Sequence, residues 1–262
     1  MLVVDVFHAA CEEGRLETVQ WLVDRFEIFA GEAHIARGQK NHAFQLACGN
    51  GRLKVALWLA EEFALTTEDA RANNNYALRV ACWSGHLAVA QWLAETFDLT
   101  TEDARADDNY ALCLTCQNGH LAVARWLVER FDLTTEDARA EDNEPLRHAC
   151  RFGRLEVAQW LVEKFDLTAA DARAKEDLAL RYACRNDHLA VVEWLLMAFN
   201  LTVEEVRAAM RRLTKSNKKE YAQKLKAIHQ VIQAGEWRPR KHRRYPRQYR
   251  ASLRTLVLLA KT

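Results

Sequence analysis

Two cysteines separated by two residues, Cys113 and Cys116, have the spacing used in thiol redox chemistry and in zinc sites. Either use needs further groups, and the sequence has no second pair with this spacing. Cys116 also belongs to a series of six cysteines that recur at a regular interval. We therefore expect both thiols to be buried packing residues.

Histidines follow three turn residues at equivalent places in the chain and could be taken for a metal array. A metal ion needs its ligands together, whereas these histidines are 34 or more residues apart in a regular series. Arginine takes the same place elsewhere in the series, which does not suit a metal site. The positions concerned are Arg15, Arg52, His86, His120, Arg154 and His188. We predict a structural role for all of them.

Paired carboxylates could act as a general acid and a general base, and Glu-Asp pairs occur at 68–69, 102–103 and 136–137. Each pair directly follows a threonine, which is typical of the first turn of a helix. We expect the pairs to cap short helices and together to form an acidic stripe. The sequence contains no evident nucleophile–base pair or phosphate-binding loop. It therefore predicts no enzyme and no catalytic, cofactor-binding or metal-binding residue.

The regular spacing of these residues indicates an array of repeats. Cysteine recurs ten residues before each of six tryptophans, and phenylalanine recurs five residues after each. The tryptophans are Trp21, Trp58, Trp92, Trp126, Trp160 and Trp194, with one step of 37 residues followed by steps of 34. Such a fixed period is typical of a solenoid, in which each unit packs mainly on its neighbours. We expect the tryptophans to lie in the core.

One repeat shows the elements that position these residues. Its apolar spacing predicts an inner helix over 76–84, an outer helix over 87–97 and a short helix over 101–106. Asn75 is a candidate N-cap for the first of these helices, and Thr100 for the third. Gly85 is placed to end the inner helix in the left-handed conformation.

A family resemblance follows from two segments, PLRHACRFGRLEVAQWLV at 145–162 and ALRVACWSGHLAVAQWLA at 77–94. Both resemble the helix–turn–helix core of an ankyrin repeat. This unit has 34 residues rather than 33, carries tryptophan where leucine is usual, and has LTTEDARA in place of the β-hairpin finger. The resemblance implies that the histidine after the turn glycine hydrogen-bonds the turn between repeats. A tetratricopeptide array, which has the same period, ranks a distant second because its glycine lies inside the first helix.

The domain organisation is one elongated array with a different C-terminal part. We predict an all-α, right-curved solenoid of six ankyrin-like repeats over 1–202, degenerate capping helices over 203–235, and a basic segment with a terminal helix over 236–262. Residues 1–202 hold 20 Lys and Arg against 32 Asp and Glu, whereas residues 203–262 hold 17 against 4. No apolar run is long enough to span a membrane, and no secretory signal is evident. An intracellular protein, cytoplasmic or nuclear and monomeric, is expected.

Residues that differ between repeats are the candidates for recognition. The resemblance implies that the residues before each turn lie on the exposed concave side of the inner helices. Large aromatic side chains flanked by arginine and asparagine are typical of binding hot spots, although packing on neighbouring repeats would explain them equally well. The predicted partner-binding residues are Tyr76, Trp83, Ser84, Tyr110, Gln117, Asn118, Arg151, Phe152, Arg185 and Asn186.

The C-terminal basic segment is the second candidate site. Its basic residues are Arg238, Arg240, Lys241, Arg243, Arg244, Arg247 and Arg250. Three uses stay open: docking on the acidic array as a cap, contact with nucleic acid or a nuclear address, and contact with an anionic membrane. The resemblance favours a non-catalytic scaffold that binds another protein on its concave face and needs no cofactor. The alternative is a nucleic-acid-associated protein that acts through the basic segment.

Overall fold

The computed structural model describes residues 2–26 and 33–199, and every regular element in these residues is an α-helix. Within these residues six helix pairs follow one another, each with an inner and an outer helix. The inner helices are α1 (Leu2–Glu13), α3 (Ala33–Gly49), α6 (Ala72–Trp83), α8 (Thr101–Asn118), α10 (Thr135–Arg151) and α13 (Ala174–Arg185). The outer helices are α2 (Leu16–Phe26), α4 (Leu53–Glu62), α7 (Leu87–Thr96), α9 (Leu121–Arg130), α11 (Leu155–Phe165) and α14 (Leu189–Ala198). The predicted all-α solenoid is confirmed.

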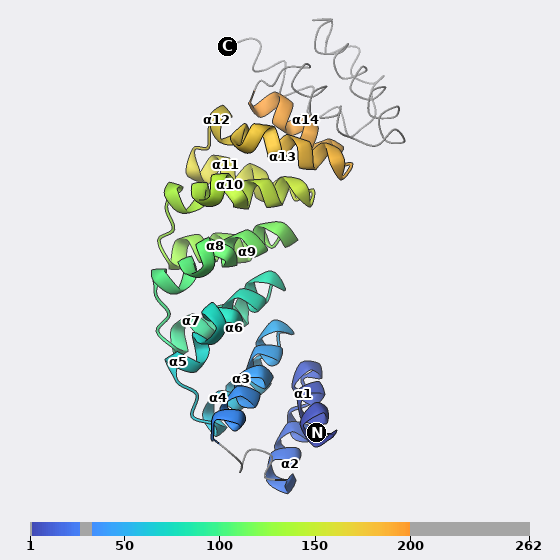
Figure 1. Cartoon of the computed structure of the whole chain (residues 1–262), viewed down its shortest axis with the longest axis vertical. Coiled ribbons are helices and arrows are strands. Elements are labelled where there is room, and N and C mark those ends of the chain that lie inside the picture. The colour runs from blue at the N-terminus through green and yellow to red at the C-terminus, as the bar shows by residue number, and fades with distance from the viewer. Residues whose placement is uncertain (1, 27–32, 200–262) are drawn as a thin grey trace, which may run out of the picture.

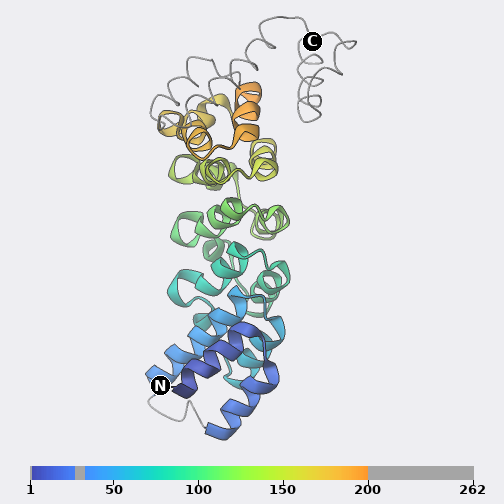
Figure 2. The same ribbon diagram turned by 90° about the vertical axis from the view of Figure 1, so that its right-hand side faces the viewer.

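The pairs stack into a curved rod (Figure 1). The concave edge lies on the side where each inner helix turns into its outer helix, which is the right-hand side of Figure 1. Seen from that edge, the helices form an inner and an outer layer side by side (Figure 2). Consecutive inner helices are therefore neighbours, and equivalent residues of successive repeats form rows along the rod.

The core runs between the two layers as one continuous apolar cluster. The inner helices contribute small residues and one larger apolar residue each, which is Phe7 in α1, Phe44 in α3 and leucine in the other four. In α6 these residues are Ala81, Cys82 and Leu78, all nearly or fully buried. The outer helices contribute the valine and leucine of each unit, such as Val89 and Leu93. Small inner-helix side chains let the layers approach closely, so this repeated pattern is sufficient to build the stack.

Each tryptophan of the outer helices meets the phenylalanine five residues later at a steep angle. The ring centroids of Trp126 and Phe131 are 5.7 Å apart, and the planes cross at 75°. Burial is uneven along the series: Trp160 is 8% exposed, whereas Trp21 in the first unit is 56% exposed. The expectation that these tryptophans lie in the core is therefore wrong for Trp21. Four others, including Trp126, are partly buried against the core.

The turn glycines adopt the left-handed conformation that was predicted for them. Gly85 has φ +81°, and an added Cβ would lie 2.6 Å from Nδ1 of His120 in the next repeat. In other repeats arginine takes the place of this histidine and binds the turn through its side chain. Arg154 Nε donates to the Gln117 carbonyl at 3.0 Å. His86 packs on Gly51 as His120 does on Gly85, since an added Cβ there would lie 2.6 Å from its Nδ1. The predicted structural role is confirmed at these positions.

Short helices link the pairs and stand in place of the β-hairpin finger, as expected from the sequence. They are α5 (Thr67–Ala70), α12 (Ala169–Ala172) and the first turns of α8 and α10. Each begins with the predicted threonine cap, with a capping box between Thr100 and Asp103 in α8. The short helices therefore form as predicted.

Three consecutive left-handed residues separate each of these four short helices from the inner helix that follows. In α6 they are Asn73, Asn74 and Asn75, with φ of 56°, 55° and 57°. The predicted N-cap role of Asn75 is wrong, because an N-cap has an extended backbone and accepts a hydrogen bond. Asn75 is left-handed and buried, and its Oδ1 has no hydrogen-bond partner.

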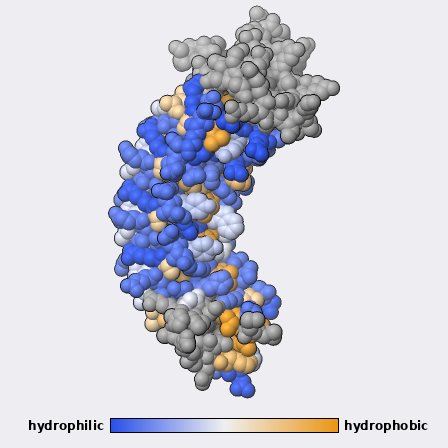
Figure 3. Space-filling view, viewed as in Figure 1, coloured by the Kyte–Doolittle hydropathy of each residue, from blue (hydrophilic) through white to orange (hydrophobic). Residues whose placement is uncertain are grey.

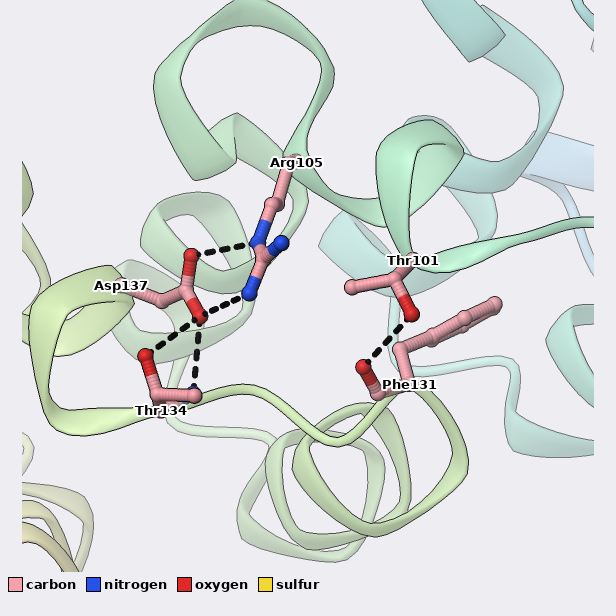
Figure 4. A network of polar contacts seen from close by, with 5 residues as sticks. All are labelled: Thr101, Arg105, Phe131, Thr134 and Asp137. Atoms are coloured by element: carbon pink, nitrogen blue, oxygen red, sulfur yellow. Dashed lines mark hydrogen bonds and ion pairs between the residues drawn. The ribbon is translucent and has the colours of Figure 1, made fainter.

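Arginines of the short helices pair with the capping aspartate of the following repeat (Figure 4). The Asp137 carboxylate accepts hydrogen bonds from the Thr134 backbone N–H and from the Arg105 guanidinium. It is only 6% exposed, and Asp69 and Asp103 are similarly buried. The predicted acidic stripe is therefore reduced to its glutamates, since Asp69 is buried and Asp103 and Asp137 pair with arginines within the rod. The predicted segments 203–235 and 236–262 lie outside the described residues.

Candidate functional site

Exposed large aromatic residues gather on the inner helices of the central repeats. Trp83 is 47% exposed at the end of α6, and Tyr76, Tyr110 and Phe152 are 36–42% exposed. Figure 3 shows pale and orange side chains together toward the concave edge, bordered by strongly hydrophilic ones. The other exposed large apolar residues of the described chain all belong to the first unit.

Tyr76 and Tyr110 begin consecutive inner helices and share one cation. The Arg79 guanidinium carbon lies 5.8 Å from the ring centroid of Tyr76 and 5.4 Å from that of Tyr110. Arg79 also forms an ion pair with Asp107, in the left-handed turn before the second part of α8. The Arg79 side chain is only 12% exposed, and its cation–π contacts link the two tyrosines.

Arg151 forms a second stack two repeats further on. Its guanidinium carbon lies 5.4 Å from the ring centroid of Phe152 and 5.0 Å from that of Tyr182. Asn186 Nδ2 donates to the Arg151 carbonyl at 2.9 Å and ties α13 to α10. Arg185 is exposed at the end of α13. Two aromatic rings and the Arg151 guanidinium therefore lie side by side here.

The smaller polar residues of the predicted site are partly used within the fold. Ser84, Gln117 and Asn118 are half-buried. Asn118 Nδ2 donates to the Leu114 carbonyl at 3.1 Å, so its amide is engaged on its own helix. Asn118 therefore has less free hydrogen-bonding capacity than the exposed arginines.

The ten predicted partner-binding residues lie on four successive inner helices, α6, α8, α10 and α13. Tyr76 and Tyr110 are at the beginnings of their helical parts, and the other eight are at or just past the ends. Sequence reasoning missed Arg79, which contacts Tyr76 and Tyr110, and Tyr182, which contacts Arg151. A signal was present for Tyr182, because the other repeats carry a different residue type at its position. Arg79 gave no such signal, since Arg147 and Arg181 hold the equivalent position in later repeats.

The cysteines have no features of a reactive site. All seven are free and buried. Burial raises the pKa of Cys11, Cys82 and Cys184 to about 12, so these thiols stay protonated at neutral pH. Burial is also the main cause that raises the pKa of Cys113. The Cys113–Cys116 pair thus has neither accessible sulfur nor thiolate character.

The described residues, 2–26 and 33–199, have neither a metal-binding cluster nor a membrane-spanning helix. No group of three or more His, Cys, Asp or Glu in these residues is arranged to hold a metal ion. None of the described helices combines the length and the apolar character that a membrane span requires. The seven basic residues proposed for nucleic-acid contact, Arg238 to Arg250, lie outside the described part.

Comparisons with known proteins agree with this architecture. No curated protein matches the chain. Among solved structures, the crystal structure of the human ASB11 ankyrin repeat domain matches with a TM-score of 0.51 and 18% identity. The match covers 76% of this chain and 85% of that one. At this identity the likeness concerns the fold.

The sequence itself gives the family. The family model described as ankyrin repeats (3 copies) matches residues 6–103 and 112–206, about three quarters of the chain. These segments contain the helix pairs, the turn glycines and the histidines or arginines that pack on them. The chain therefore belongs to the ankyrin repeat family.

Proposed function

We propose that this chain is a non-catalytic scaffold that binds a partner protein on the inner-helix face of repeats three to six. Ankyrin repeats generally mediate protein–protein interaction. The observation that carries the proposal is the gathering of exposed aromatic residues on this one face, with Trp83 and Phe152 prominent. Arginine and aromatic side chains contribute disproportionately to binding energy at protein interfaces.

A comparison of affinity purifications tests this proposal. The tagged chain is compared with a Trp83→Ala plus Phe152→Ala variant by quantitative mass spectrometry. The matched control is Trp21→Ala plus Phe26→Ala, which removes two exposed aromatic residues from the first unit. The expected result is loss of specific partners from the face variant and retention by the control. Equal recovery by all three proteins would contradict the proposed face.

The basic C-terminal segment supports a second proposed function, contact with nucleic acid. Seven Lys and Arg occur among the 15 residues from 236 to 250, interspersed with Trp237, Tyr245 and Tyr249. Electrophoretic mobility shifts at graded salt, with and without residues 236–262, test it. Binding that weakens steeply with salt and disappears on truncation is expected. Binding that is unchanged by truncation would assign any nucleic-acid contact to another part of the chain.

A further inference from the structure

One position of the inner helices, two residues before the left-handed turn residue, carries a different type of side chain in successive repeats. Because the repeats are equivalent, these residues form one row on the concave edge. From the first unit to the sixth, the row is Glu12, Gly49, Trp83, Gln117, Arg151 and Arg185. One end of the row is therefore acidic, the middle is aromatic, and the other end is basic. We call it the concave row.

The basic end of the concave row offers free hydrogen-bond donors. Arg151 and Arg185 are exposed, and neither forms an ion pair with a described residue. The face of the Arg151 guanidinium is covered by Phe152 and Tyr182, at 5.4 Å and 5.0 Å. Stacking on the face leaves the N–H groups at the edge free, which is the geometry that accepts a carboxylate through two bonds.

The middle of the row offers an apolar contact. Trp83 is 47% exposed at the end of α6. Its neighbour in the row, Gly49, has no side chain, and an added Cβ would meet Val80 Cγ2 at 3.2 Å. The adjacent repeat thus offers no side chain at the position of the row next to Trp83. A large apolar residue of a partner fits this position.

From these contacts we propose that the concave row binds a linear acidic segment of a partner protein, and that the segment lies along the row in one fixed orientation. Its carboxylates pair with Arg151 and Arg185, and an apolar or aromatic residue packs on Trp83. This inference rests on the proposed function and specifies the partner. Glu12 at the far end repels the acidic end of the segment and so sets the direction.

The spacing of the row defines the segment. Neighbouring helices pack about 8–10 Å apart, so two to three repeats separate Trp83 from the arginines by roughly 16–30 Å. An extended chain rises about 3.3 Å per residue. The apolar residue of the partner should therefore lie about five to nine residues from its acidic residues.

A nucleic-acid strand fits the row less well than an acidic peptide. Phosphates occur at every nucleotide, whereas only two exposed guanidinium groups occur in the row. Residues 1–202 carry 12 more acidic than basic residues, and Glu12 lies in the row itself. A continuous line of phosphates would meet this negative charge beyond Arg151.

Selection from a phage-displayed library of random peptides tests the inference with the full chain as bait. Peptides of about 16 residues are long enough to span the row. Enrichment of Asp or Glu about five to nine residues from an aromatic or large aliphatic residue is expected. Absence of enrichment, or enrichment with no acidic preference, would overturn the inference.

Affinity of one enriched, fluorescein-labelled peptide is then measured by anisotropy. Arg151→Glu plus Arg185→Glu should weaken binding about tenfold or more. A Lys-for-Asp/Glu version of the peptide should regain affinity for that variant. The control, Arg125→Glu plus Lys164→Glu, makes the same charge change at exposed outer-helix sites and should stay within about twofold. Circular dichroism melting confirms that each variant is folded.

Different failures point to different conclusions. Peptides that need Trp83 and Phe152 but not the two arginines would overturn the acidic-segment inference and leave the proposed function standing. Peptides that bind regardless of all four residues would contradict both. A fluorescein-labelled single strand of about 15 nucleotides that binds through Arg151 and Arg185, where no acidic peptide does, would assign the row to nucleic acid.

Discussion

Arg105 donates two hydrogen bonds to Asp137, one repeat further along, with Nε–Oδ1 and Nη2–Oδ2 distances of 2.7 Å and 2.9 Å (Figure 4). The same carboxylate accepts the Thr134 backbone N–H at 2.7 Å and so caps its own short helix. Arg71–Asp103 and Arg139–Asp171 repeat the arrangement. Each of these aspartates thus both starts a helix and joins two repeats.

This double role predicts that Asp137 contributes more to the free energy of unfolding than its neighbour Glu136. Asp137→Ala should lower the free energy of unfolding by about 2 kcal/mol, since it removes the cap and leaves Arg105 without its partner. Glu136→Ala changes the adjacent, exposed carboxylate and should have no measurable effect. Urea unfolding followed by circular dichroism measures both. Equal destabilisation by the two variants would contradict the double role.

The same contacts predict acid sensitivity. Burial alone would raise the pKa of Asp171, but hydrogen bonds from Arg139 and Thr168 outweigh it and hold the pKa at about 2. The pKa values of Asp103 and Asp137 are lowered in the same way. A depressed pKa adds stability above the unfolded value near 4, and this stability is lost as pH falls toward 2.

Asp171→Asn provides the test of that linkage. The variant should be less stable than the parent at pH 7 because the charged contacts are lost. Its urea midpoint should then fall less steeply between pH 4 and pH 2, since this site no longer titrates. Parallel pH profiles for the two proteins would show that Asp171 does not contribute to the acid transition.

The turn between repeats predicts a strong effect of one methyl group. Gly85→Ala places a Cβ 2.6 Å from His120 Nδ1 and forces alanine to φ +81°. A loss of about 1–3 kcal/mol in the free energy of unfolding is expected. Gly38→Ala is the control, because nothing lies within 4 Å of its Cβ position inside α3. It should stabilise the helix by about 0.5–1 kcal/mol. Similar effects of the two substitutions would contradict the packing of His120 on the turn.

Tryptophans at the same position of different repeats should differ in their contribution to the free energy of unfolding. Trp160 is 8% exposed and Trp21 is 56% exposed, although both occupy the same position of an outer helix. Trp160→Ala should cost about 3–5 kcal/mol of unfolding free energy, and Trp21→Ala about 1 kcal/mol. Chemical denaturation compares them directly. A larger effect at Trp21 would mean that its surroundings differ from those described.

Much of the fold could be predicted because the repeat period determines the order and spacing of the helices. The spacing of Cys82, Trp92 and Phe97 gave the helix pair, and Gly85 gave its turn. The pairing of Arg71 with Asp103 could not be found in one repeat, since it depends on how repeats stack. Candidate site residues such as Trp83 were recognisable as breaks in the repeat. The positions of Arg79 and Tyr182 depend on neighbouring helices and were missed.

Asn75 shows a different limit. A polar run before an apolar helix is typical of an N-cap, but asparagine and aspartate also tolerate the left-handed conformation. The run Asn73–Asn75 adopts the second of these, and so do Asp107–Asn109 and Glu141–Asn143. Local sequence does not separate the two outcomes, because both are favoured by the same short polar side chains.

The left-handed turns predict one stabilising substitution. Glu141 has φ 48° and ψ 46°, and unlike asparagine it has no special tolerance for this conformation. Glu141→Gly removes the steric cost and keeps the carbonyl that accepts Arg147 Nη2 at 2.6 Å. The free energy of unfolding should rise by about 0.5–1 kcal/mol. Glu141→Ala, which retains a Cβ, should leave it unchanged, and urea midpoints compare the two. A less stable Glu141→Gly variant would contradict the left-handed assignment.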